Sequence, residues 1–194
     1  MKHQPLIKKL RAGLKADETG NKANSLIFLH HYGFNIPLTY LVTTVAYGRY
    51  LSEGSALVAE LAKEIDLLPE RTYAVRSSTT AEDSGEYSFA GQFQTLINVS
   101  GAENISKAVQ SVWDSVALLN NSEYLKRTGV SEIRCGVIIQ EMIPSLLAGV
   151  SFSRNPVTDQ NETVIEAVEA AGEELVQNCL LYTSPSPRDR TRSR

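Results

Sequence analysis

The stretch AVRSSTTAED, residues 74–83, combines a short apolar segment, an arginine and a run of hydroxyl side chains. Residues 73–76 predict a strand, and the polar stretch 77–88 predicts a loop that follows it. Arg76 carries a planar guanidinium that can bind a phosphate through two hydrogen bonds, and the hydroxyls and amides of the loop can hold further phosphate oxygens. The alternative is structural, because Thr79 and Glu82 have the spacing of a capping box at a helix start. The residues alone leave both interpretations open.

Three other positions are candidate contacts to the same ligand. Gly91 lies fifteen residues after Arg76, and a glycine allows a backbone to approach a ligand, although it more often serves a turn. Lys22, in the predicted polar turn 18–22, could neutralise a phosphate, although an isolated lysine is usually only solvated. Gln140, with residues 141 and 142 at the end of a predicted strand, could present backbone groups to the edge of a base. The structural alternative for Gln140 is an edge strand that enters a loop at Pro144.

The spacing of apolar residues indicates an α+β or mixed α/β domain. Thr43 or Thr44 is expected to cap one helix and Ser55 another. Residues 6–15 fit either a strand or a helix. Helices are expected over 23–32, from 43 or 44 to about 51, over 55–68 and over 105–119, and strands over 38–43, 73–76, 93–99, 136–142, 147–152 and 163–168.

Composition excludes several classes of protein. The chain has 194 residues, of which 42% are hydrophobic and 21% charged, as in ordinary globular domains. A net charge of -3 without a basic stripe argues against nucleic-acid binding. No apolar run approaches the roughly 18 to 20 residues of a membrane span. Cys135 and Cys179 are too few for a disulfide framework or a zinc cage, and no secretion signal is visible, so we expect a cytoplasmic protein. His30 and His31 are expected at the surface, because adjacent residues on a helix cannot present a metal-ligand pair on one face.

The last sixteen residues differ from the rest. Residues 179–194 contain two prolines and four arginines without apolar periodicity. We expect this segment to be a disordered basic tail, and its change in composition suggests that it is not native to the domain.

Several segments, taken in order, resemble the N-terminal nucleotide-binding domain shared by phosphoenolpyruvate synthase, pyruvate phosphate dikinase and rifampicin phosphotransferase. The resemblance extends over about residues 15–178, and its most specific parts are AVRSSTTAED and SFAGQ at their fixed spacing. The matching segments are GNKANSL at 20–26, IP at 36–37, LVTT at 41–44, AVRSSTTAED at 74–83, SFAGQ at 88–92, IQEMI at 139–143 and GVSFSRNPVT at 149–158.

The resemblance implies an α+β, ATP-grasp nucleotide-binding domain over residues 1–178, in which two lobes hold ATP and Mg2+ bridges the phosphates. Lys22 and Arg76 match the basic ATP contacts of the family. Gly91, Thr95 and Leu96 match its phosphate-covering loop, and Gln140 matches the adenine-side hinge.

The chain also departs from the family pattern. The interval between Tyr47 and Arg76 is short, and AAGE at 170–173 stands where the family has GLGE. The family's metal-ligand segment, phosphohistidine domain and pyruvate-binding domain have no match, so the domain is expected to be C-terminally truncated and to supply no catalytic or metal-binding residue of its own.

The implied function is the ATP-binding part of a phosphotransferase of the pyruvate, water dikinase type. In the full-length protein, ATP would phosphorylate a histidine on another domain, and the phosphoryl group would then pass to pyruvate. We expect this chain to be inactive by itself. The alternatives are a fragment of a rifampicin-type antibiotic phosphotransferase and a non-catalytic nucleotide-binding module.

Overall fold

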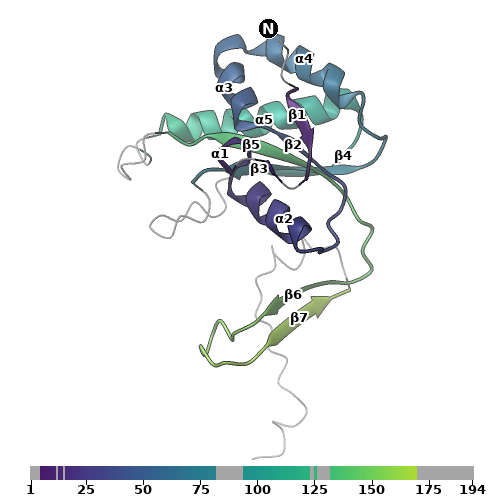
Figure 1. The fold of residues 1–194 in the computed structure, drawn as a ribbon, viewed down its shortest axis with the longest axis vertical. Helices are drawn as coiled ribbons and strands as arrows, with labels where there is room; N and C mark the ends of the chain where they lie inside the picture. The colour runs from purple at the N-terminus through teal and green to yellow at the C-terminus, as the bar shows by residue number, and fades with distance from the viewer. Residues whose placement is uncertain are drawn as a thin grey trace, which may run out of the picture. The chain divides into compact units, whose positions relative to one another are not determined.

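The computed structural model describes residues 5–11, 13–14, 16–81, 94–122, 125 and 132–169. The chain divides into two compact units at Met142 and Ile143. In the described part of the first unit, an antiparallel sheet has the strand order β1-β2-β5-β3-β4 (Figure 1). Its strands are β1 (Ile7–Lys9), β2 (Thr39–Val42), β3 (Tyr73–Thr79), β4 (Thr95–Val99) and β5 (Cys135–Glu141), and the helices are α1 (Ala16–Thr19), α2 (Asn21–His31), α3 (Thr44–Glu53), α4 (Ser55–Ile65) and α5 (Ala102–Asn120).

The second unit contains an antiparallel ribbon of β6 (Ala148–Phe152) and β7 (Val164–Val168) within its described residues. Cross-strand pairing places Val150 opposite Glu166 and Phe152 opposite Val164. A loop between the strands is held by Asn155, whose Oδ1 accepts hydrogen bonds from the Val157 and Thr158 amides at 2.9 and 3.1 Å. Helices and antiparallel sheets together confirm the α+β class.

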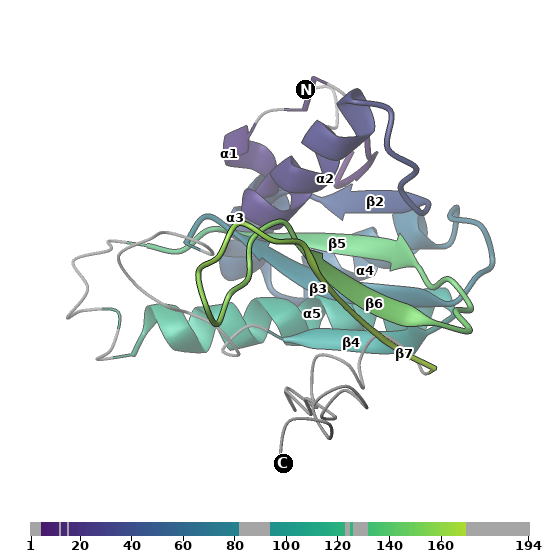
Figure 2. The same ribbon diagram turned by 90° about the horizontal axis from the view of Figure 1, so that it is seen from below.

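The two faces of the five-stranded sheet are covered by different helices. Figure 1 shows α3 and α4 on one side of the sheet and α2 on the other, and Figure 2 views the sheet from the α2 side. Because directly paired residues of antiparallel strands share a face, the register defines both faces. One face, called the α5 face, carries Val42, Val75 and Ile139, whose side chains pack against α3, α4 and α5. The α2 face carries Leu41 and Ile138, which pack with Ala23, Leu26 and Ile27 of α2.

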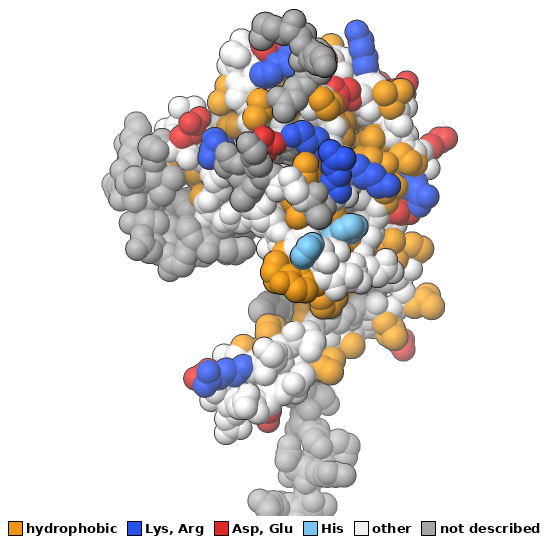
Figure 3. All heavy atoms as spheres, viewed as in Figure 1, with side chains coloured by type: hydrophobic (Ala, Val, Ile, Leu, Met, Phe, Trp, Pro, Cys, Tyr) orange, Lys and Arg blue, Asp and Glu red, His pale blue; other side chains and the backbone are white. Residues whose placement is uncertain are grey.

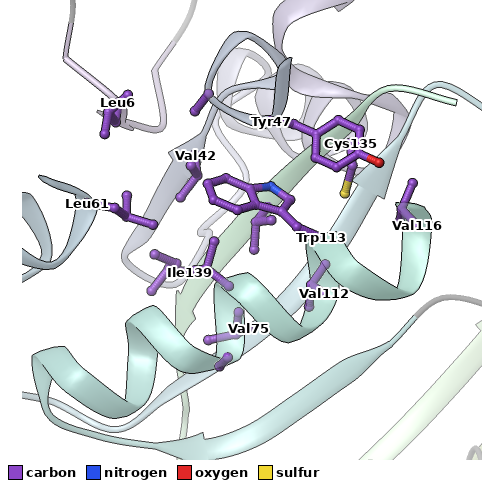
Figure 4. Close-up of a cluster of buried hydrophobic side chains, with 14 of the residues drawn as sticks. Leu6, Val42, Tyr47, Leu61, Val75, Val112, Trp113, Val116, Cys135 and Ile139 are labelled. Atoms are coloured by element: carbon purple, nitrogen blue, oxygen red, sulfur yellow. The ribbon is translucent and has the colours of Figure 1, made fainter. Parts of the chain in front are cut away.

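The main core lies on the α5 face and surrounds Trp113 of α5 (Figure 4). Tyr50 stacks on the Trp113 ring with a centroid distance of 4.8 Å, and Tyr47 lies 6.4 Å away. Trp113 is the single tryptophan of the chain, so its fluorescence reports the unfolding of the first unit specifically.

Leu61 of α4 is fully buried in this core, and its truncation tests the packing. Leu61→Ala is expected to lower the free energy of unfolding by about 3 kcal/mol, because it removes apolar contacts and leaves a cavity. Urea denaturation followed by Trp113 fluorescence measures the change. Leu67→Ala is the matched control, because Leu67 is 83% exposed and its truncation is expected to cost less than about 0.5 kcal/mol. Equal losses in the two variants would show that Leu61 is not a core residue.

Tyr47 makes the free energy of unfolding of the first unit depend on pH in the alkaline range. Burial raises the pKa of Tyr47 to about 12, against an opposing contact in which Asn120 Nδ2 donates to Tyr47 Oη at 3.4 Å. Between pH 10 and 12 the unfolded chain releases the Tyr47 proton while the folded chain retains it, so stability falls as the pH rises. Tyr47→Phe is expected to reduce this slope in denaturation curves measured from pH 9 to 12. A part remains, because burial also raises the pKa of Tyr73. An unchanged slope would contradict the burial of an ionisable Tyr47.

Most predicted elements are confirmed, including the cap at Thr43, whose hydroxyl accepts a hydrogen bond from the Ala46 amide at 3.4 Å. The polar turn 18–22 is wrong, since Thr19 ends α1 and α2 begins at Asn21, with only Gly20 between them. The Ser55 cap is also wrong, because Gly54 at φ +58° precedes α4 and no side chain caps that helix. Segment 6–15, which fitted a strand or a helix, contains β1.

His30 and His31 are exposed at the end of α2, as expected. Figure 3 shows the histidines of α2 beside hydrophobic side chains, and Phe28 and Tyr32 are exposed in that part of the helix. No helix in the described residues is long and apolar enough to cross a membrane. Gly91, residues 170–173 and the predicted tail 179–194 lie outside the described residues.

Candidate nucleotide-binding site

The first turn of α2 lies directly against β3. Gly20 precedes the helix at φ +77°, and a Cβ added to it would lie 2.0 Å from the carbonyl oxygen of Ser78. The Ser78 hydroxyl accepts a hydrogen bond from the Ala23 amide at 2.9 Å, so a strand side chain satisfies one of the free donors at the start of the helix. Gly136 of β5, opposite Ser78, also packs closely, since a Cβ added to it would lie 2.8 Å from the Thr19 carbonyl oxygen. These contacts fix the start of α2 on the sheet.

This packing corrects two predictions for the hydroxyl run. β3 continues to Thr79, so Thr79 is a strand residue and not a helix cap. Ser77, Ser78 and Thr79 are each 0% exposed, and Ser78 is occupied by the Ala23 amide. These three hydroxyls are therefore buried in the fold, which favours the structural interpretation for this part of the run, whereas Ser84 lies outside the described residues.

Arg76 lies on the same face of the sheet as α2. It pairs with Ile138 of β5 on one side and with Thr95 of β4 on the other, and Ile138 packs in the α2 cluster. Arg76 is exposed. Within the described residues its guanidinium forms no hydrogen bond or ion pair. By contrast, Arg49 bonds Glu53 and Glu60, and Arg71 bonds Glu141.

Gln140 lies farther along the α2 face. It pairs with Thr39 of β2 and with Ala74 of β3, which precedes Arg76 by two residues on the same face. Gln140 Nε2 donates to Thr39 Oγ1 at 3.0 Å, and Thr39 Oγ1 donates to the Pro37 carbonyl at 2.7 Å. Gln140 is half-buried, whereas Thr39 is buried.

These residues follow one line along β3. The start of α2 with Lys22 adjoins Ser78, Arg76 is two residues further, and Ala74 with its neighbour Gln140 is two further still. At about 3.3 Å per residue, the line is about 13 Å long. Along it the start of α2 comes first, the Arg76 side chain second and the Gln140 amide third, an order that suits a polyphosphate at one end and a base at the other.

The predicted site residues are only partly brought together. Lys22 in the first turn of α2, Arg76, Thr95 and Gln140 share the α2 face. Lys22 is half-buried and already contacts a protein group. Leu96 pairs with Val75 and packs against the main core on the opposite face, so its side chain does not join the others. A role for the Leu96 backbone stays a prediction, and so do the roles of the other five residues.

Thr39 is a partner of the candidate residue Gln140 that sequence reasoning missed. It lies in a predicted strand and alternates in phase with Leu41, which places both on one face. Its contact with Gln140 joins residues 101 positions apart, and only the pairing of β2 with β5 reveals it.

A separate cleft of about 450 Å3 lies between β4 and α5, and its lining includes none of Lys22, Arg76 and Gln140. Its lining includes Leu96, Asn98, Asn104 and Lys107, and Lys107 forms an ion pair with Glu103 at 2.6 Å. Among the described residues, no three His, Cys, Asp or Glu side chains come together as metal ligands.

The family model described as "Pyruvate phosphate dikinase, AMP/ATP-binding domain" matches residues 55–184 of the chain. The chain belongs to this family. The matched region of the dikinase AMP/ATP-binding domain contains β3, β4 and β5, and therefore Arg76, Thr95 and Gln140.

Three named relatives are similar to more than half of this chain. The chain is 31% identical over 189 residues to the prodigiosin synthesizing transferase PigC of Serratia marcescens, covering 84% of this chain and 21% of that protein. It is 32% identical over 181 residues to the uncharacterized phosphotransferase YvkC of Bacillus subtilis, covering 81% of this chain and 22% of YvkC. It is 38% identical over 110 residues to phosphoenolpyruvate synthase of Pyrococcus furiosus, covering 55% of this chain and 14% of that enzyme. The chain thus spans about a fifth or less of the length of these relatives.

Proposed function

We propose that this chain is the ATP-binding part of a phosphoenolpyruvate synthase-type phosphotransferase, and that ATP binds along the α2 face. The polyphosphate lies between Lys22 and Arg76, and the adenine lies at Gln140. The observation that carries the proposal is the exposed Arg76, which has no protein partner among the described residues and lies on the same face of the sheet as the start of α2. The chain belongs to an AMP/ATP-binding family, so a nucleotide phosphate is the natural partner for this guanidinium.

The chemistry of these groups suits a polyphosphate. A guanidinium binds phosphate oxygens through two charge-assisted hydrogen bonds, which are stronger than neutral ones. The positive end of α2 and the Lys22 ammonium add charge at the other end of the same ligand. Preorganised cations of this kind stabilise the charge that develops during phosphoryl transfer.

We extend the proposal to the fold and to the whole reaction. An ATP-grasp fold has two lobes, and an apolar two-stranded ribbon such as β6 and β7 fits the start of a second lobe, because such a ribbon needs further partners for stability. In the full-length protein, a phosphoryl group would pass from ATP to a histidine of another domain and then to pyruvate. The names of the phosphoenolpyruvate synthases support this acceptor, whereas none of the relatives named above supports rifampicin.

Mg2+ enters the proposal as a part of MgATP. Among the described residues, no three His, Cys, Asp or Glu side chains come together to hold a metal ion. The ion would therefore arrive bound to the phosphates of ATP. We place the reaction in the cytoplasm, and the buried Cys135, which forms no disulfide, fits a reducing compartment.

Isothermal titration of the chain with MgATP tests the proposal. We expect one saturable site per chain and competition by AMP, since the family binds AMP or ATP. Absence of saturable binding at millimolar MgATP, in a sample whose Trp113 fluorescence shows a folded first unit, would overturn the proposal.

A further inference from the structure

We infer that Thr39 orients the Gln140 amide so that the site prefers a 6-amino purine to a 6-oxo purine. The inference rests on the proposed function, because it assumes that a purine nucleotide reaches Gln140. It concerns a residue that contacts Gln140 and acts only through it, so Thr39 is a positioning residue.

The orientation follows from the number of protons in the hydrogen-bond chain. The Pro37 carbonyl can only accept, and it lies 2.7 Å from Thr39 Oγ1, so the single hydroxyl proton of Thr39 is directed to it. The Thr39 oxygen can then only accept from Gln140. The group at 3.0 Å must therefore be the Gln140 amide nitrogen, because a carbonyl oxygen there would face another acceptor.

The carbonyl oxygen of Gln140 is consequently the group available to a ligand. Thr39 lies on one side of Gln140 in the sheet, and Ala74 on the other side offers only a methyl group. Within the described residues, no donor contacts Gln140 Oε1. An outward acceptor pairs with the exocyclic amine of adenine and meets a second acceptor in a 6-oxo purine.

Burial makes this orientation durable. Thr39 is 3% exposed and the hydrogen-bond chain begins at a backbone carbonyl, so water does not replace either contact easily. Without the Thr39 oxygen, the Gln140 amide can turn by 180° and present its NH2 group, which suits a 6-oxo base.

Binding of ATP and inosine triphosphate to three forms of the full chain tests the inference. Inosine triphosphate carries an oxygen at the position of the adenine amine. The wild type is expected to bind MgATP about tenfold more tightly than the inosine analogue, which corresponds to one hydrogen bond and an avoided acceptor clash. Thr39→Val is expected to bring the ratio of the two affinities close to one, whereas Thr39→Ser, which retains the hydroxyl, is expected to keep the wild-type ratio.

The outcomes separate this inference from the proposed function. If the wild type binds neither nucleotide, the proposed function fails. If it binds both equally, or if Thr39→Val keeps the wild-type ratio, the function stands and the role of Thr39 is overturned. Loss of the preference in Thr39→Ser would equally contradict it, because packing would then be the cause. Should Thr39→Val not fold, the wild-type ratio and the smaller variant Thr39→Ala still decide.

Discussion

Arg76→Ala is expected to weaken MgATP binding by roughly 10- to 100-fold while changing the free energy of unfolding by less than about 0.5 kcal/mol. The loss in affinity is that of charge-assisted hydrogen bonds to phosphate, worth about 1.5 to 3 kcal/mol. The small change in stability is expected because Arg76 is exposed and its guanidinium bonds no protein group among the described residues. Isothermal titration measures the affinity, and urea denaturation measures the stability.

Arg71→Ala is the matched control for Arg76→Ala. Arg71 precedes the same strand, and its guanidinium forms an ion pair with Glu141. Removing it changes the net charge by the same amount but removes no proposed ligand contact, so MgATP affinity is expected to stay within about twofold of wild type at 0.15 M salt. Equal affinities of Arg76→Ala and the wild type would dismiss Arg76 as a phosphate ligand. Equal losses in both arginine variants would show a general charge effect.

Gly20→Ala is expected to destabilise the first unit by about 5 kcal/mol and to abolish MgATP binding. The added Cβ would lie 2.0 Å from the Ser78 carbonyl oxygen and 2.4 Å from its carbon, and the backbone at φ +77° is strained for alanine. Ser78 cannot retreat, because β3 is paired with β5 along its whole length. The start of α2 would have to leave the sheet, which exposes Ala23, Leu41 and Ile138.

Gly33→Ala separates backbone strain from the close contact. Gly33 follows α2 at φ +81°, and an added Cβ would meet nothing within 4 Å. Its expected cost is therefore only the left-handed strain of about 1 to 2 kcal/mol, with MgATP affinity unchanged. Denaturation followed by Trp113 fluorescence compares the two variants. If Gly20→Ala is no less stable than Gly33→Ala, the close packing of α2 on β3 is wrong.

The parts of the fold that depend on local patterns could be predicted from the sequence. The apolar spacing of 105–119 predicted the helix that forms α5, and its regularly spaced Val109, Val112 and Val116 are buried. Thr43 or Thr44 was predicted to cap the start of α3, because capping depends on residues close in sequence, and the structure shows Thr43 as the cap.

The site depends on contacts between distant segments, which local patterns do not contain. Gly20 looked like part of a polar turn, and its need for the absence of a side chain arises from Ser78, which is far along the chain. The hydroxyl run after Arg76 fitted either a phosphate-binding loop or a structural segment, and the pairing of β3 with β5 shows that Ser77, Ser78 and Thr79 are buried strand residues. Leu96 was predicted beside Thr95, but adjacent strand residues point to opposite faces.

An NMR titration of the isotope-labelled chain with MgATP tests most directly whether the start of α2, Arg76 and Gln140 form one nucleotide site on the α2 face. Saturable chemical-shift changes are expected at the backbone amides of the first turn of α2, at the Arg76 side-chain Nε–H and at the Gln140 side-chain amide, all with one dissociation constant. Changes confined to the cleft between β4 and α5, at Asn98, Asn104 and Lys107, with Arg76 and Gln140 unmoved, would contradict it.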